Sequence, residues 1–180
     1  MHSMSLSKIV LVYAFSVVSV IAMLNAEHVP YKLVDNVCKK QRNKQFCLEV
    51  LKSDARSKFA KDITTLTKIA IDVATKNSTA TRDYFLGVKT GPPAVLKSLK
   101  DCIGLYNNVI VNFKNCLNEG ECSLIGYDIH IAGDDVRGCQ AIADSNGAHD
   151  SFITARNDIT QEFCGLCESM ANLMCSQTRA

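Results

Sequence analysis

The apolar residues from position 57 onward recur at steps of three and four, and this spacing limits the possible folds more than any other feature of the chain. Such spacing places apolar side chains along one face of a helix. It predicts four long helices, over residues 57–88, 92–117, 123–144 and 151–177. Since long amphipathic helices joined by short turns pack side by side, we expect an all-α, up-down-up-down four-helix bundle.

The predicted core consists of the residues that repeat along each helix. In the first helix these are Ile63, Leu66, Ile69, Ala70 and Val73. The second and third helices contribute Leu99, Cys102, Tyr106, Val109, Phe113 and Cys116, then Ile125, Ile129, Ala132, Val136, Cys139 and Ala143. In the last helix the predicted core residues are Phe152, Ala155, Ile159, Phe163, Leu166, Met170 and Leu173.

The N-terminus has the layout of a secretory signal peptide. One cation, Lys8, precedes an uncharged apolar stretch over residues 9–24, and the small residue Ala26 then precedes the polar Glu27. A membrane anchor is the alternative, but this stretch is short for a span of about 20 residues. We therefore expect a signal peptide over residues 1–26, a secreted domain over residues 27–180, and no membrane attachment after cleavage.

Charge and cysteine content narrow the class of protein. The chain has 20 Lys and Arg against 18 Asp and Glu, so loss of Lys8 with the signal peptide leaves a net charge of +1. This balance disfavours a nucleic-acid-binding protein, which usually carries a basic excess. All 9 cysteines follow the predicted signal peptide, and in a secreted chain they predict a disulfide framework. Because the number is odd, at least one thiol has no partner within the chain.

Cys38 and Cys47 enclose a strongly polar loop, CKKQRNKQFC. A zinc site usually spaces paired cysteines by two to four residues, and no histidine lies near Cys38. A disulfide is therefore favoured over a metal site or a redox pair. It would close a short helical hairpin before the bundle and stabilise it by roughly 2–3 kcal/mol in the chain-entropy model.

The other cysteines leave the connectivity open. Cys102 and Cys139 occupy core positions on helices that follow one another, and antiparallel packing would bring them together. Cys116 and Cys122 flank the NEGEC turn, so a third disulfide between them is a further hypothesis. Three more cysteines, Cys164, Cys167 and Cys175, lie on the last helix. Cys164 and Cys167 are expected to pack as small, buried apolar side chains. As an alternative, one of the three forms a bridge to Cys116 or to another chain.

No motif indicates catalysis, a cofactor or a metal site. The nucleophile-elbow, zinc-protease and phosphate-loop patterns are not found in the sequence. Asp134 and Asp135 are adjacent, so on a helix they point in different directions and form no facing acid–base pair. One sequon, at Asn77, predicts possible N-glycosylation. The chain is therefore expected to bind a partner and not to be an enzyme.

Several of these features together resemble the plant invertase and pectin methylesterase inhibitor family. They are the signal peptide, the CKKQRNKQFC loop, a long helix near RSKFAKDI, and the phrases LKSLKDCIGLYNNVI and IAGDDVRGC. The resemblance implies a secreted four-helix bundle with an N-terminal helical hairpin. It also implies disulfides between Cys38 and Cys47 and between Cys102 and Cys139.

The function that the resemblance implies is inhibition of a carbohydrate-active enzyme of the plant cell wall, by a helical surface that covers the enzyme's substrate cleft. Invertase inhibitors of the family typically carry Pro-Lys-Phe in the turn that here reads Gly120-Glu121-Cys122. Pectin methylesterase is therefore favoured over acid invertase as the protein partner. The alternative from another class is a secreted bundle without an enzyme target, such as a structural or storage protein or a carrier of small ligands.

Overall fold

The structure is a computed structural model that describes residues 31–178, so the predicted signal peptide lies outside the described residues. Six α-helices and one short 3-10 helix make up this part of the chain, and no strand occurs in it. No helix among residues 31–178 is long and apolar enough to cross a membrane. The all-α prediction is confirmed.

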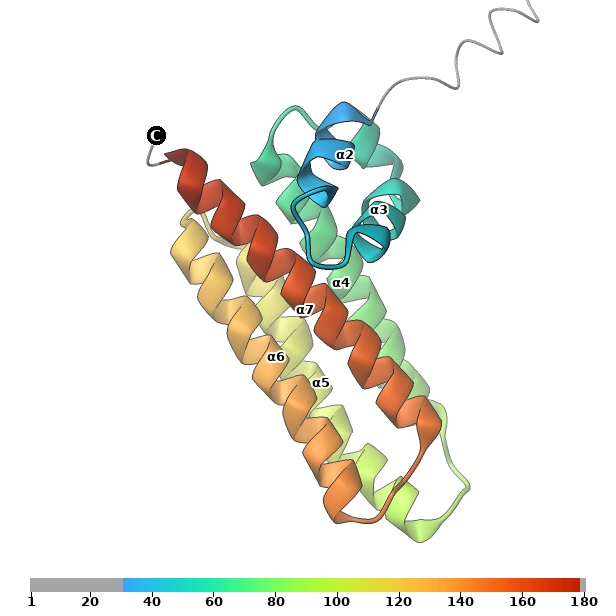
Figure 1. Cartoon of the computed structure of the whole chain (residues 1–180). Coiled ribbons are helices and arrows are strands. Elements are labelled where there is room, and N and C mark those ends of the chain that lie inside the picture. The colour runs from blue at the N-terminus through green and yellow to red at the C-terminus, as the bar shows by residue number, and fades with distance from the viewer. Residues whose placement is uncertain (1–30, 179–180) are drawn as a thin grey trace, which may run out of the picture. The chain divides into compact units, whose positions relative to one another are not determined.

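Four long helices form the bundle in Figure 1: α4 (Ile63–Gly87), α5 (Pro93–Asn118), α6 (Cys122–Ser145) and α7 (Ser151–Thr178). Each packs against two others, since α5 contacts α4 and α6 while α7 contacts α6 and α4. The first helix was predicted to begin at residue 57, which is wrong. Asp62 accepts a hydrogen bond from the Thr65 amide (2.7 Å) and caps α4, so the chain before it forms a separate 3-10 helix, η1 (Ala55–Phe59).

Proline, glycine and aspartate residues in the turns define where the bundle helices begin and end. Prolines at positions 92 and 93 open α5, because proline has no amide hydrogen to leave unpaired in a first turn. Gly147 has φ of +68° just after α6, and the Ala148 amide donates to the Ala143 carbonyl (2.9 Å). The Asp150 carboxylate then accepts from the amides of Phe152 (2.8 Å) and Ile153 (3.0 Å) and caps α7.

The predicted core of α5 and α6 is confirmed, because all twelve of the expected residues are buried. In α4 four of the five expected residues are buried, and Val73 is only partly buried. Small polar residues continue this core face. Ser78 and Thr67 are fully buried, and each hydroxyl donates to the backbone carbonyl four residues earlier. Their hydroxyls are therefore paired without a partner from another helix.

The core face of α7 differs from the prediction in its first half. Phe152 and Ile159 are 64% and 45% exposed, and Ala155 is also exposed. A seam of buried positions runs at steps of four and three through Ile153, Asn157, Thr160, Cys164, Cys167, Ala171 and Met174. In the first half of the helix its only large apolar residue is Ile153, so the pattern of large apolar side chains pointed to the wrong face there. In the second half the predicted Phe163, Leu166 and Met170 are buried, and Leu173 is partly buried.

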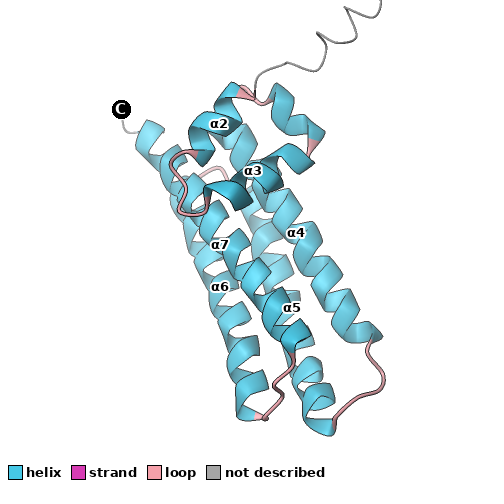
Figure 2. Cartoon of the chain, turned by 45° about the vertical axis from the view of Figure 1, so that its right-hand side comes forward, coloured by secondary structure: helices cyan, strands magenta, loops and turns pink. Residues whose placement is uncertain are grey.

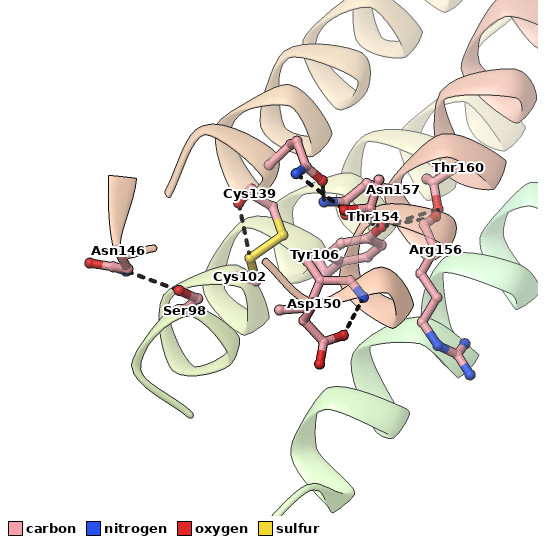
Figure 3. Close-up of a disulfide and its surroundings, with 12 residues drawn as sticks. Ser98, Cys102, Tyr106, Cys139, Asn146, Asp150, Thr154, Arg156, Asn157 and Thr160 are labelled. Carbon is pink, nitrogen blue, oxygen red and sulfur yellow. Dashed lines mark hydrogen bonds between the residues drawn. A yellow bond between two sulfur atoms is a disulfide. The ribbon is translucent and has the colours of Figure 1, made fainter. Parts of the chain in front are cut away.

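A buried hydroxyl explains why Asn157 and Thr160 face inward. The phenol of Tyr106, which is fully buried on α5, donates to Asn157 Oδ1 (2.9 Å) and lies 3.2 Å from Thr160 Oγ1 (Figure 3). Asn157 Nδ2 in turn donates to Gln140 Oε1 on α6 (2.9 Å). Burial raises the pKa of Tyr106 to about 12, so the phenol stays protonated and remains a donor. These bonds join α5, α6 and α7.

Two short helices, α2 (Lys32–Cys38) and α3 (Lys44–Ser53), form the predicted hairpin and precede η1 and the bundle (Figure 2). Val34, Val37, Val50 and Leu51 are its buried apolar residues. Arg56 on η1 makes ion pairs with Asp54 and with Asp72 of α4, and Lys76 pairs with Asp72 at 3.0 Å. The Arg56 guanidinium lowers the pKa of Asp54 to about 2. These ion pairs link the segment after the hairpin to the first bundle helix.

Three disulfides and three free thiols account for the 9 cysteines. Cys38 is bonded to Cys47 and Cys102 to Cys139, the two pairs that the resemblance implied. The hypothesis of a Cys116–Cys122 bridge is wrong, because Cys122 is bonded to Cys175. Cys116 faces the core, with its Sγ 3.6 Å from the Ile125 carbonyl oxygen, whereas Cys122 is half-buried at the start of α6 beside the last turn of α7.

Replacement of Tyr106 by phenylalanine should destabilise the bundle, because Asn157 Oδ1 would lose its donor in a buried site. We expect the free energy of unfolding to fall by about 1–3 kcal/mol. Urea unfolding followed by circular dichroism measures it. Tyr127→Phe is the matched control, since Tyr127 is 63% exposed and should leave the transition unchanged. Equal stability of the two variants would contradict a role for the buried hydroxyl.

The disulfide assignment predicts a definite thiol count. Burial raises the pKa of Cys116 and Cys164 to about 12 and that of Cys167 well above its usual value. A thiol reagent at pH 8 should therefore find no reactive thiol in the native oxidised protein and three in denaturant, and peptide mapping should place the label on these three residues. A count of one in denaturant, or a label on Cys122 or Cys175, would contradict the assignment.

Candidate functional site

The turn between α5 and α6 is restrained where α6 begins. The Ser123 hydroxyl donates to the Glu121 carboxylate (2.6 Å), and Cys122 forms a disulfide with Cys175. The bridge to Cys175 attaches this turn to the last turn of α7. It therefore presents an acidic and covalently restrained segment, with no Pro-Lys-Phe in it.

The sequon residue Asn77 lies in the middle of α4. Its side chain is partly buried, and its Oδ1 atom has no contact with solvent and no hydrogen-bond partner among the described residues. Ser78, the next residue of the sequon, is fully buried. Occupancy of the sequon stays a prediction, and this placement offers a sugar little room.

Asp134 and Asp135, the two adjacent carboxylates noted in the sequence, have different surroundings. Asp134 pairs with Arg137 on its own helix, while burial raises the pKa of Asp135, which bonds to Asn108 of α5. His130 is 58% exposed and lies 3.9 Å from Asp134 and 4.0 Å from Glu168. No group of three or more His, Cys, Asp or Glu within residues 31–178 is arranged to hold a metal ion.

A groove of about 360 Å³ runs between the hairpin loop and the helices α6 and α7. Its ionisable lining residues are Arg42, His130, Arg137, Glu162 and Glu168. Across the groove, Asn43 Nδ2 donates a hydrogen bond to the Glu162 carboxylate (3.2 Å). Arg137 of α6 donates a hydrogen bond to Gln161 Oε1 of α7 (3.2 Å). Both charge signs occur here, so the groove has no marked preference for an anion or a cation.

The helices α5 and α6 each carry large apolar side chains that are exposed to solvent. Val111 is 54% exposed on α5, and Leu124 and Tyr127 are 46% and 63% exposed on α6. All three lie in the half of the bundle nearest the restrained turn, because α5 ends and α6 begins there. Apolar and aromatic residues on a rigid surface are typical of protein-binding sites.

A second exposed cluster joins α4 and α7. The Arg156 guanidinium lies 3.9 Å from the centre of the Tyr84 ring, and the Phe152 ring lies 6.4 Å from the same ring. Tyr84 and Phe152 are 37% and 64% exposed. The sequence reading missed this cluster because Phe152 was placed in the core. Val111, Leu124 and Tyr127 were detectable as apolar residues outside the helical seam.

Neither set of residues contains a nucleophile beside a base. Both sets are therefore suited to recognition of a partner by shape, apolar contact and charge. The comparisons with known proteins agree with such a role. The family model for plant invertase/pectin methylesterase inhibitors matches residues 32–167, which is most of the chain. No curated protein matches the sequence.

Two solved structures have a similar fold. One is a mutant form of a pectin methylesterase inhibitor from Arabidopsis, with a TM-score of 0.61 and 22% identity, covering 76% of this chain and 93% of that one. The other is a pectin methylesterase inhibitor from Arabidopsis thaliana, with a TM-score of 0.57 and 18% identity, covering 78% and 95%. Proteins of the matched family are extracellular. This chain belongs to the plant invertase/pectin methylesterase inhibitor family, whose members are inhibitors and not enzymes.

Proposed function

We propose that this protein is a secreted inhibitor of a pectin methylesterase, with residues 27–180 as its mature domain. It acts by covering the substrate cleft of the enzyme in a complex of one inhibitor and one enzyme. The observation that carries the proposal is the exposed apolar surface on α5 and α6, formed by Val111, Leu124 and Tyr127, in a chain of this family. Below, this set is called the α5–α6 surface.

Rigidity supports inhibition by occlusion. The Cys102–Cys139 bridge joins α5 to α6, with a Cα–Cα distance of 4.8 Å, and the Cys122–Cys175 bridge joins α6 to α7. A surface that is already ordered loses little conformational freedom when it binds, so more of its contact energy appears as affinity. The α5–α6 surface lies between these two bridges.

The restrained turn favours pectin methylesterase over acid invertase. Gly120, Glu121 and Cys122 stand in the turn where invertase inhibitors typically carry Pro-Lys-Phe, so the turn has neither the cation nor the aromatic ring of that motif. The Cys122–Cys175 bridge further limits how far the turn can move into a deep pocket. A carrier of apolar ligands is also disfavoured, because the groove of about 360 Å³ has Arg137, Glu162 and other polar residues in its lining beside apolar ones.

Titration of the purified oxidised protein against a plant pectin methylesterase and an acid invertase, at pH 5 and pH 7, tests the function. We expect saturable loss of pectin methylesterase activity at near-equal stoichiometry, and no effect on invertase at the same concentrations. Inhibition of invertase alone would contradict the proposed target. Loss of neither activity, with the protein shown to be folded, would contradict inhibition and favour a structural or storage role.

Truncation of Tyr127 tests the surface. Tyr127→Ala should weaken inhibition by roughly tenfold or more, because a central aromatic side chain commonly contributes about 1–2 kcal/mol or more to an interface. Phe152→Ala is the matched control, since Phe152 is 64% exposed against 63% for Tyr127 but lies on the opposite cluster. Weaker inhibition by Phe152→Ala, with Tyr127→Ala unchanged, would place the contact on α4 and α7 and contradict the α5–α6 surface.

A further inference from the structure

Charge is divided unequally between the hairpin segment and the bundle. Residues 32–61, which hold α2, α3 and η1, contain nine Lys or Arg and three Asp or Glu, a net charge of +6. Residues 62–178 contain nine Lys or Arg and fourteen Asp or Glu, a net charge of −5. The near-neutral total therefore hides a cationic segment beside an anionic bundle.

Four of these cations lie in one short loop. Lys39, Lys40, Arg42 and Lys44 occupy residues 39–44, called the basic loop here, and all four are exposed. Among the described residues, no carboxylate lies within ion-pair distance of any of them. Two other cations of the segment are paired, because Lys52 lies 3.2 Å from Asp35 and Arg56 pairs with two aspartates. The charge of the basic loop is thus available to a ligand.

The loop is also held in place. The Cys38–Cys47 bridge closes it, with the two Cα atoms 5.5 Å apart. Asn43 caps α3 by accepting a hydrogen bond from the Phe46 amide (3.1 Å), and its Nδ2 donates to Glu162 of α7 (3.2 Å). Gln41, which lies within the loop, is buried. Four positive charges are therefore displayed close together at little cost in backbone order on binding.

We propose that the basic loop binds an acidic polysaccharide, namely the carboxylate-bearing chain that remains when pectin methyl esters are hydrolysed. The choice of polysaccharide rests on the proposed function, because the product of a pectin methylesterase is a linear polymer of carboxylates. A cluster of unpaired Lys and Arg side chains complements such a polyanion, and the methyl-esterified polymer offers it no charge.

This binding places the two functions on different parts of the molecule. The basic loop attaches the inhibitor to polymer that the enzyme has already processed, and the α5–α6 surface remains available for the enzyme. Attachment to the same polymer raises the effective concentration of inhibitor near the enzyme without any new contact between the two proteins. Nucleic acid is the competing polyanion, and the measurement of DNA binding below distinguishes it from the polyuronate.

The test measures binding of polygalacturonate and of fully methyl-esterified pectin to the oxidised protein, by isothermal titration calorimetry with no enzyme present. The variant changes Lys39, Lys40, Arg42 and Lys44 together to glutamine. Its matched control changes Lys68, Lys89, Lys100 and Lys114 to glutamine, which removes the same charge from exposed positions on the bundle. Circular dichroism and the thiol count verify that each variant is folded.

We expect polygalacturonate to bind the native protein and the control, and to bind the loop variant at least about tenfold more weakly. Affinity of the native protein should also fall roughly tenfold or more between 50 and 200 mM NaCl, as counterion release predicts, and this requires no variant. Equal binding by the two variants, equal binding of the esterified polymer, or tighter binding of a DNA duplex than of polygalacturonate would overturn the proposal.

The result is separable from the proposed function. Inhibition of the enzyme on a short soluble substrate does not require the polymer, so the loop variant should inhibit as well as the native protein. Normal inhibition with no polygalacturonate binding would reject the polysaccharide site alone. Polygalacturonate binding with no inhibition would reject the proposed enzyme target and leave the basic loop as a polyuronate-binding site.

Discussion

The buried hydroxyl of Tyr106 sets the rotation of the last helix. A phenol that is fully buried on α5 requires a hydrogen-bond partner, and unpaired burial of such a group is costly. Asn157 and Thr160 satisfy it only because α7 turns this polar pair inward. The same rotation brings Cys164 and Cys167 into the core and leaves Phe152 and Ile159 in solvent. This polar contact therefore accounts for the inward face of the first half of α7, and buried Phe163, Leu166 and Met170 hold the second half.

The sequence predicted the architecture well where the core is built from large apolar residues. On α5 and α6 every expected core residue is buried, because leucine, isoleucine, valine and phenylalanine recur through the whole seam, with alanine and cysteine between them and no asparagine or threonine. In the first half of α7 the buried positions include Asn157 and Thr160, and periodicity of large apolar residues then indicates the wrong face, whereas Phe163, Leu166 and Met170 in the second half are buried as predicted. The error had one detectable signal, since Asn157 and Thr160 have the spacing that continues through Cys164 and Cys167.

The candidate sites were harder to predict, because each depends on residues far apart in the sequence. The disulfide partner of Cys122 is Cys175, which lies 53 residues away. Nothing in the sequence near Cys122 favours Cys175 over Cys116 as that partner. The apolar α5–α6 surface depends on which residues two packed helices leave uncovered. Summing charge over the whole chain also concealed the basic loop, because the excess of carboxylates from residue 62 onward cancels the excess of cations before it.

The opposite net charges of the hairpin segment and the bundle give the molecule a permanent electric dipole. Near a negatively charged matrix, the electric field of the matrix exerts a torque on this dipole and turns the cationic end toward the matrix before any contact forms. The bundle then points away from the polymer and toward whatever moves through the surrounding solution. Orientation in a field thereby adds to the specificity that contact surfaces provide, and it weakens as salt shortens the range of the field.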